Sequence, residues 1–306
     1  KVHHHQEHYQ KNKIMKTKVY SAFPGVGKTT YFNTTNRNVL DSDSSKFDKK
    51  LFPDNYIQHI ERNIQDPKVD KILVSSDFTK QVITSSVFDK KDKDSNTLLG
   101  QLKIQKPVEV LFEGINLDVY DNKKPSEPRI DTILKDVKES FCFLFVGHWL
   151  KGDFEQDRKN VGGMIRVFLE VFKDKKNPPA LIVKTNRGSS SLTDRVYTKK
   201  MIQSIKDSVG SNKLPNIYLL NSDLSDAEVN ALYNHSKVKA HLSFTRGEGF
   251  GRPLLEATIS GKPMVVSAWS GHVDFLNKDM VNLIGGGLTN VHESAADKFL
   301  LKEAQW

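Results

Sequence analysis

The stretch Glu248-Gly249-Phe250-Gly251-Arg252-Pro253-Leu254-Leu255-Glu256 joins a glycine-rich turn to a helix start and has a carboxylate at each end. Proline is favoured at the start of a helix. We therefore expect a helix from about 253, with Glu256 in its first turn and Glu248 in the loop before it. The free amides and the partial positive charge at this helix end suit a phosphate or a hydroxyl-rich ligand. Both acids are expected to face that one point.

Apolar runs and helical patterns alternate on both sides of this stretch. Strands are expected at 141–146, 180–184, 217–220, 239–244 and 263–267. Helices are expected at 160–172, 193–209, 225–233 and 253–260, and the third of these begins with a capping box at Ser225. Regular alternation predicts an α/β fold, a Rossmann-like parallel sheet with helices on both faces. Ligands of such sheets bind beyond the carboxyl ends of the strands.

Polar residues follow several of these strands, where that rule places a ligand. The candidate binding residues are Gly147, His148, Arg158, Lys159, Lys184, Thr185, Gly249, Phe250, Gly251 and Arg252. Cations among them would stabilise a diphosphate, and carboxylates would hold sugar hydroxyls. Simpler readings stay open: the two glutamates could cap a helix and form ion pairs, Lys184 could be a surface lysine, and His148 and His272 could be structural.

Residues 77–306 resemble the donor-binding half of family-4 (group 1) glycosyltransferases of the GT-B fold, phage-encoded ones especially. The resemblance is carried by the 247–256 run, by Phe145-Val146-Gly147, by Arg158-Lys159-Asn160 and by the 270–276 turn. It implies a hexosyltransferase that transfers sugar from a nucleotide-sugar donor with retention and needs no metal. It also implies a catalytic pair, with Glu248 facing the donor sugar and Glu256 the ribose. His148 stands where the family commonly has arginine.

The amino-terminal part follows a different plan. A short strand at 18–23 runs into a turn containing Gly25, Gly27, Lys28 and Thr29, and a helix start is expected directly afterwards. This layout is typical of a phosphate-binding P-loop, although Ala22 stands where the pattern has glycine. Residues 16–76 resemble phage P-loop nucleotide kinases, which implies ATP and Mg²⁺ as ligands of this segment. Asp41 and Asp43 could hold a metal or substrate there, or cap a turn.

These readings predict a mosaic chain. Its parts are a disordered tail at 1–14, a partial P-loop unit at 15–76, a remnant of an acceptor domain with a linker at 77–130, and a nucleotide-sugar-binding domain at 131–306. Transfer activity is expected to be incomplete because most of the acceptor domain is missing. Two alternatives remain: a P-loop kinase or NTPase with a passenger domain, and a nucleotide-sugar-binding module without catalysis.

Composition limits the kinds of partner and the compartment that we expect for this protein. The 306 residues carry a net charge of +9, and because lysines alternate with Asp and Asn, a solvated surface is favoured over a phosphate-rich partner. Nucleic acid is considered only as an acceptor. Cys142 is the single cysteine and lies in an apolar run, which favours a reducing compartment. With no membrane span or signal peptide evident, a cytoplasmic protein is expected, in the host cytoplasm if phage-encoded.

Overall fold

The computed structural model describes the short segments 18–20 and 31–33 and residues 70–92, 94–123, 127–211, 213–296 and 304–306. The chain divides into two compact units, an N-terminal unit ending at Phe112 and a C-terminal unit beginning at Glu113. The predicted tail at 1–14 lies outside the described residues, as do Gly25, Gly27, Lys28, Thr29, Asp41 and Asp43.

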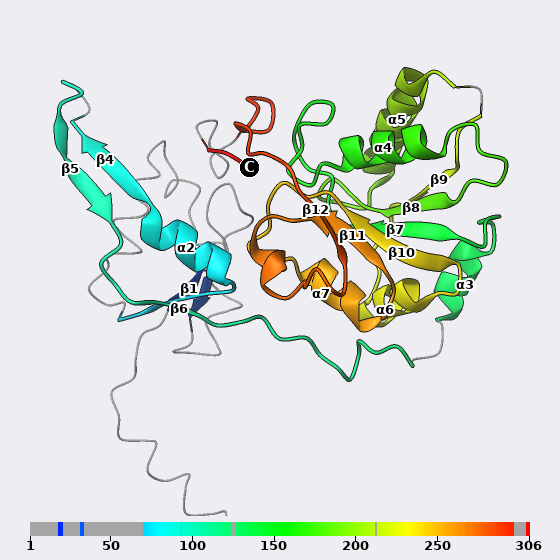
Figure 1. Ribbon diagram of the computed structural model, residues 1–306, viewed down its shortest axis with the longest axis horizontal. Helices are drawn as coiled ribbons and strands as arrows, with labels where there is room; N and C mark the ends of the chain where they lie inside the picture. The colour runs from blue at the N-terminus through cyan, green and yellow to red at the C-terminus, as the bar shows by residue number, and fades with distance from the viewer. Residues whose placement is uncertain are drawn as a thin grey trace, which may run out of the picture. The chain divides into compact units, whose positions relative to one another are not determined.

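The C-terminal unit holds a six-stranded sheet in the order β12-β11-β10-β7-β8-β9, with every neighbouring pair parallel (Figure 1). The strands are β7 (Cys142–Val146), β8 (Ala180–Lys184), β9 (Ile217–Leu220), β10 (Val238–Ser243), β11 (Met264–Ser267) and β12 (Asn282–Ile284). The helices are α3 (Pro128–Leu134), α4 (Val161–Phe172), α5 (Leu192–Val209), α6 (Asp226–Asn234) and α7 (Arg252–Ile259), with a 3-10 turn, η2, at Gly271–Asp274. The α/β fold expected from the sequence is confirmed.

The sheet of this unit is buried on both faces. Cys142 and Leu144 of β7 pack with α3, α6 and α7, whereas Phe145 packs with α4 and α5 on the other side. Strand β8 divides in the same way, because Ala180 and Ile182 join the first core, whereas Leu181 and Val183 join the second. Successive side chains of a strand point to opposite faces. Near-continuous apolar runs therefore form the central strands of a sheet that has helices on both sides (Figure 1).

Helix starts in this unit are fixed by local chemistry. The predicted capping box at Ser225 is confirmed: its hydroxyl accepts a hydrogen bond from the Glu228 amide, and the Glu228 carboxylate accepts one from the Ser225 amide. Helix α7 begins at Arg252, after Gly251 in the left-handed region at φ 95°. Glu256 therefore lies just beyond the first turn of the helix. The sequence had predicted a position within the first turn.

The N-terminal unit contains a four-stranded sheet in the order β2-β1-β3-β6, formed by β1 (Lys18–Tyr20), β2 (Tyr31–Asn33), β3 (Ile72–Val74) and β6 (Val108–Val110). Strand β3 is parallel to β1 and β6, and β2 is antiparallel to β1. Helix α2 (Asp77–Ser85) follows β3, with Ser76 as its N-cap, and an antiparallel hairpin joins β4 (Val87–Lys91) to β5 (Leu98–Lys103).

Four features of the predicted organisation differ from the structure. The boundary expected at 76/77 lies inside the N-terminal unit, because β6 pairs with β3 across it. The many charges of segment 89–96 favour a linker in the sequence, but this segment is part of the β4–β5 hairpin. The helix expected after Thr30 is replaced by β2, whose aromatic residues favour a strand. The linker assigned up to 130 belongs to the C-terminal unit from Glu113 on, since Tyr120 is buried in its core.

No helix in the described part of the chain is both long and apolar enough to cross a bilayer.

Candidate functional site

The loops after β7, β8, β10 and β11 emerge at one edge of the C-terminal sheet, because these strands are parallel. Backbone hydrogen bonds tie the loops together. The Arg246 amide donates to the Arg158 carbonyl at 2.8 Å, and the Gly147 amide donates to the Lys184 carbonyl at 3.1 Å. This is the edge at which ligands of open α/β sheets bind.

Glu248 lies in this edge as a buried anion with cationic partners. Its side chain contacts the Lys159 ammonium group directly, and Arg158 Nη1 lies 3.5 Å from Glu248 Oε2. Arg158 also donates to the Gly247 carbonyl at 2.5 Å. Burial alone would raise the pKa of Glu248, but Lys159 and then Arg158 outweigh it and lower that pKa to about 2. Glu248 is therefore ionised across the ordinary pH range.

Lys159 is also buried, and burial lowers its pKa against the opposing effect of Glu248. The two side chains form a buried ion pair whose charges largely cancel within the protein. In this structure Lys159, which was expected to face a diphosphate, is paired with Glu248, which was expected to face the sugar. A ligand at this edge would have to share or exchange these contacts.

Glu256 has a different set of partners. Arg252 Nε donates to Glu256 Oε1 at 2.9 Å, and the Tyr233 hydroxyl donates to Glu256 Oε2 at 3.3 Å. Burial raises the pKa of Glu256, and the Arg252 charge and hydrogen bonds from Arg252, Tyr120 and Tyr233 only partly oppose this. The side chain of Glu248 thus contacts Lys159 and Arg158, whereas the side chain of Glu256 contacts Arg252 and two tyrosines. Neither Tyr120 nor Tyr233 was among the site residues predicted from the sequence.

The glycine-rich turn between the two acids is held against the turn after β11. The Glu248 amide donates to Ser270 Oγ at 2.8 Å, and the Gly271 amide donates to the Glu248 carbonyl at 2.9 Å. A Cβ on Gly271 would overlap the Gly249 carbonyl oxygen, and one on Gly251 would lie 2.9 Å from His272 Cβ. The rings of Phe250 and Phe275 add a contact at 5.0 Å between centroids. The turn is therefore pre-formed.

His272 is fully buried beneath this turn. Its Nε2 lies 2.7 Å from the Ser267 carbonyl oxygen, so this nitrogen carries the proton and donates. Burial lowers the pKa of His272, which favours the neutral ring. The remaining nitrogen, Nδ1, has no hydrogen-bond partner among the described residues. His272 therefore supports the turn from below.

A buried acid lies at the start of helix α4, and it was not among the site residues predicted from the sequence. Asp157 is fully buried, and its Oδ2 accepts a hydrogen bond from the Val161 amide at 3.2 Å. Burial raises the pKa of Asp157 against these hydrogen bonds. The Val161 amide at the start of α4 is therefore not available to another anion.

A second polar group is formed by residues that follow β7, β8 and β9. Exposed His148 places Nδ1 at 2.6 Å from Asn186 Oδ1, and Asn221 Nδ2 donates to the Thr185 carbonyl at 3.2 Å. Thr185 Oγ1 and Asn221 Oδ1 are buried without a partner among the described residues. Burial lowers the pKa of the half-buried Lys184, opposed by Asp223. Thr185 Oγ1 can donate or accept a hydrogen bond, whereas Asn221 Oδ1 can only accept one. The sequence pointed to Thr185 but not to Asn221.

Within the described residues, no group of three or more His, Cys, Asp or Glu side chains is placed to hold a metal ion.

The parallel sheet and the polar loops beyond its strand ends define the C-terminal unit as an α/β domain with a ligand-binding edge. Residues 156–285, from the loop before α4 to the end of β12, match the family model described as Glycosyl transferases group 1. No curated protein matches the chain.

Three solved structures illustrate the similarity. WaaG, a glycosyltransferase involved in lipopolysaccharide biosynthesis, has 17% identity and a TM-score of 0.49, over 74% of this chain and 53% of that one. HepE of Anabaena, in complex with UDP and glucose, has 14% identity and a TM-score of 0.45, over 71% and 50%. The pneumococcal O-GlcNAc transferase GtfA, in complex with UDP and GlcNAc, has 15% identity and a TM-score of 0.44, over 74% and 36%. The chain spans about half or less of the length of these proteins.

Proposed function

We propose that this chain binds a nucleotide-sugar at the edge formed by the loops after β7, β8, β10 and β11, and takes part in sugar transfer with retention of anomeric configuration. The observation that carries the proposal is the buried Glu248–Lys159 pair beside the pre-formed glycine turn, inside the segment that matches the group 1 family. Anionic and hydroxyl-rich parts of one ligand would find partners of both kinds there.

The roles follow from charge. Lys159, Arg158 and Lys184 would hold the diphosphate and stabilise the negative charge that it gains as the leaving group. Glu248, once Lys159 turns to the phosphate, would accept hydrogen bonds from the sugar hydroxyls. Glu256 would do the same for the ribose. We propose that no metal is needed, so EDTA is expected to leave donor binding unchanged.

The test is isothermal titration of the full chain with UDP, GDP and ADP, and with UDP-glucose and UDP-GlcNAc. Loss of a hydrogen bond to a charged group costs about 1.5–3 kcal/mol, roughly ten- to a hundredfold in affinity. Glu256→Gln should weaken the nucleotide and its sugar conjugate alike. Glu248→Gln should weaken binding of the nucleotide-sugar only. It removes an acceptor for the sugar hydroxyls, but it leaves Lys159 free to bind the phosphates. Failure of every nucleotide and conjugate to bind would exclude the proposal.

The matched control is Lys28→Ala in the N-terminal unit, which should leave donor affinity unchanged. The same variant addresses the P-loop alternative, which would require Mg²⁺-dependent ATP binding that Lys28→Ala abolishes.

A binding module without catalysis is the second candidate, because Glu248 and Glu256 both have partners within the protein. Radiolabelled donor distinguishes the two: binding with neither hydrolysis nor transfer to any supplied acceptor supports the module.

A further inference from the structure

The loop between β7 and α4 carries Arg158 and Lys159, and its backbone conformation needs support from elsewhere. Glu155 and Asn160, one on each side of these two cations, have positive φ angles of 62° and 50°. A positive φ is unfavourable for glutamate and less so for asparagine, so the surrounding structure must enforce it at Glu155. The placement of both cations therefore depends on contacts from outside the loop.

Arg246, in the loop after β10, supplies such contacts. Its amide donates to the Arg158 carbonyl and its Nη2 donates to the Glu155 carbonyl, both at 2.8 Å. The buried Asp157 attracts the guanidinium as well, because it opposes the fall in the pKa of Arg246 that burial causes. Arg246 thus ties both ends of the segment 155–158 to the end of β10.

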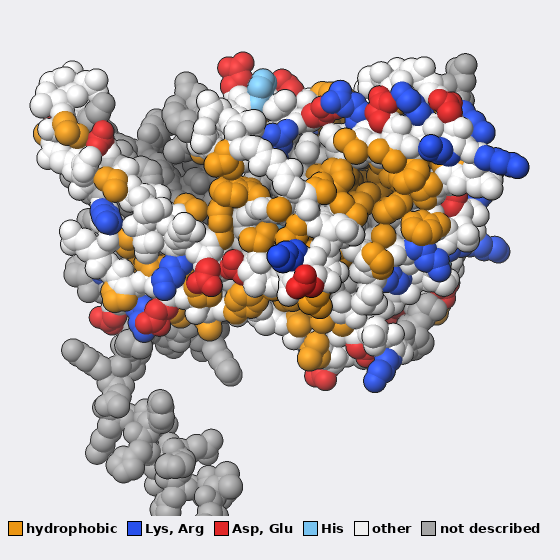
Figure 2. Space-filling model, viewed as in Figure 1, with side chains coloured by type: hydrophobic (Ala, Val, Ile, Leu, Met, Phe, Trp, Pro, Cys, Tyr) orange, Lys and Arg blue, Asp and Glu red, His pale blue; other side chains and the backbone are white. Residues whose placement is uncertain are grey.

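The Arg246 guanidinium lies over the ring of Trp306, with 5.0 Å between its Cζ atom and the ring centroid. Exposed hydrophobic side chains gather on the face of the C-terminal unit that carries α4 (Figure 2), but Trp306 is only 4% exposed. It belongs to neither of the two large cores and packs with Val291 and Ala295 in a small separate cluster. A guanidinium over an indole is attracted by the ring, and more strongly where water is excluded. Trp306 therefore restricts the positions open to Arg246.

The chain around Trp306 is attached to the same loop. Trp306 exchanges two backbone hydrogen bonds with Thr289, both at 3.0 Å. Ser294, a few residues further on, accepts a hydrogen bond from the Asp153 amide at 2.8 Å. The indole is thus fixed relative to the start of the loop as well as to Arg246.

We propose that Arg246 and Trp306 are positioning residues of the proposed donor site. Trp306 holds the Arg246 guanidinium against the loop, Arg246 fixes the loop backbone, and the loop presents Arg158 and Lys159 to the phosphates of a nucleoside diphosphate. Trp306 acts on the ligand only through Arg246 and the loop. The role toward a ligand rests on the proposed function, whereas the support of the loop can be measured without a ligand.

Hydrogen–deuterium exchange of the full chain, read by mass spectrometry without ligand, tests the support of the loop. Trp306→Leu removes the aromatic face, and Arg246→Met removes the guanidinium. In both variants, peptides covering 152–160 should exchange at least about threefold faster, because fewer contacts oppose local opening. Peptides from β8 should not change, and an unchanged unfolding midpoint confirms that a variant is folded. Unchanged exchange of 152–160 in Trp306→Leu would overturn the proposal.

Isothermal titration with UDP, GDP and ADP, and with the matching monophosphates, tests the connection to the ligand. Trp306→Leu should weaken the diphosphate that the wild type binds roughly tenfold, and its monophosphate about threefold or less, since the displaced cations are those assigned to the phosphates. Trp306→Phe keeps an aromatic face for the guanidinium and should restore most of the loss. Equal losses for the two nucleotides, or no recovery with phenylalanine, would count against a positioning role.

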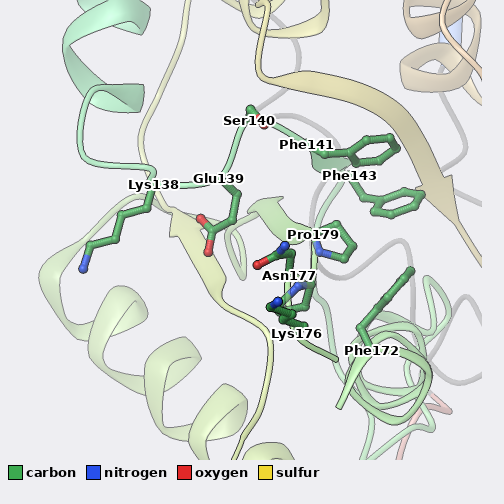
Figure 3. Close-up of a pocket in the computed structure, with 10 residues that line it drawn as sticks. Lys138, Glu139, Ser140, Phe141, Phe143, Phe172, Lys176, Asn177 and Pro179 are labelled. Carbon is green, nitrogen blue, oxygen red and sulfur yellow. The ribbon is translucent and has the colours of Figure 1, made fainter. Parts of the chain in front are cut away.

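Two controls lie away from these contacts. Phe141→Leu removes an aromatic ring from the groove at the opposite end of the same strands (Figure 3), and Lys199→Met removes an exposed cation on α5. Both should leave loop exchange and nucleotide affinity unchanged, and a loss equal to that of Trp306→Leu would overturn the proposal. If the wild type binds no nucleotide, the proposed function fails and the positioning role fails with it. If Trp306→Leu binds as tightly as the wild type, the positioning role alone fails.

Discussion

Glu248 and Glu256 are each 7% exposed and stand at the two ends of one nine-residue run, yet their carboxyl groups have opposite properties. Glu248 faces Lys159 and Arg158, and its pKa falls to about 2. Glu256 faces tyrosine hydroxyls and one arginine that is itself largely exposed, and its pKa rises. The difference shows that burial alone does not determine whether a carboxyl group is charged. The nearest cation, and how deeply that cation is itself buried, determine it.

The largest expected effect comes from breaking the buried pair. Removing one partner of such a pair costs about 3–5 kcal/mol, since it leaves an uncompensated buried charge. Lys159→Met and Glu248→Gln should each lower the free energy of unfolding by this amount, and the double variant by less than the sum. Tryptophan fluorescence in a urea titration measures it, because Trp149, Trp269 and Trp306 all lie in the C-terminal unit. Lys199→Met is the exposed control; an equal loss there would contradict the role of the pair.

The pH dependence of stability should separate the two glutamates. Glu248 has a folded pKa below the ordinary 4.5, so its stabilisation is present above pH 4.5 and is lost as the pH falls toward 2, roughly 3 kcal/mol in all. Glu256 has a raised folded pKa, so its contribution is present below pH 4.5 and is lost as the pH rises through that raised value.

Relative to the wild type, Glu248→Gln should therefore become less stable as pH rises from 2 to 4.5, and Glu256→Gln more stable as pH rises above 4.5. Unfolding in urea across pH 2–8 measures both slopes. Slopes of the same sign for the two variants would show that the partners do not differ as described.

A smaller effect is expected from the turn that separates the two acids. Gly251→Ala should cost about 2 kcal/mol, because φ 95° is strained for alanine and the new Cβ would press on His272. Gly261→Ala is the matched control, also at positive φ but facing open space, and should cost about 1 kcal/mol. Chemical unfolding compares them, and equal costs would mean that the His272 contact is not tight.

The smallest effect is expected at Tyr233. Its single hydroxyl proton is shared between the Pro253 carbonyl at 3.0 Å and Glu256 Oε2 at 3.3 Å, so Tyr233→Phe should cost about 1 kcal/mol. It should also raise the pKa of Glu256 further, since a donor to the carboxylate is lost. NMR titration of a ¹³C-labelled glutamate side chain reads that pKa, and a fall would contradict the contact.

Local patterns predicted most of the C-terminal sheet. The bounds of β8 and β9 and the cap at Ser225 follow from apolar runs and a capping box, which depend on near neighbours in the chain. The β4–β5 hairpin was missed because charge indicated a linker. In the structure Asp92 Oδ1 accepts from the amides of Asp94 and Ser95, so charged residues build the turn.

The residue types of the candidate site could be predicted from the sequence, but the contacts between these residues could not. Glycines, cations and acids beyond strand ends are visible in the sequence. Which cation meets which acid depends on contacts such as Lys159 with Glu248, separated by 89 positions. Tyr120 and Asp157 carried no local signal, because their importance arises only from burial beside Glu256 and beneath α4.

The two cores on either side of the C-terminal sheet bear on how the unit opens. Strands β7 and β8 have hydrogen-bonded neighbours on both sides and apolar contacts on both faces, so their amides should exchange with solvent only on global unfolding. Strand β12 borders the sheet and leaves Ile284 exposed, so it can open locally. Two of the four loops of the proposed donor site, those after β7 and β8, thus extend from slowly exchanging strands. A ligand bound to these two loops would be supported by strands that open only when the whole unit unfolds.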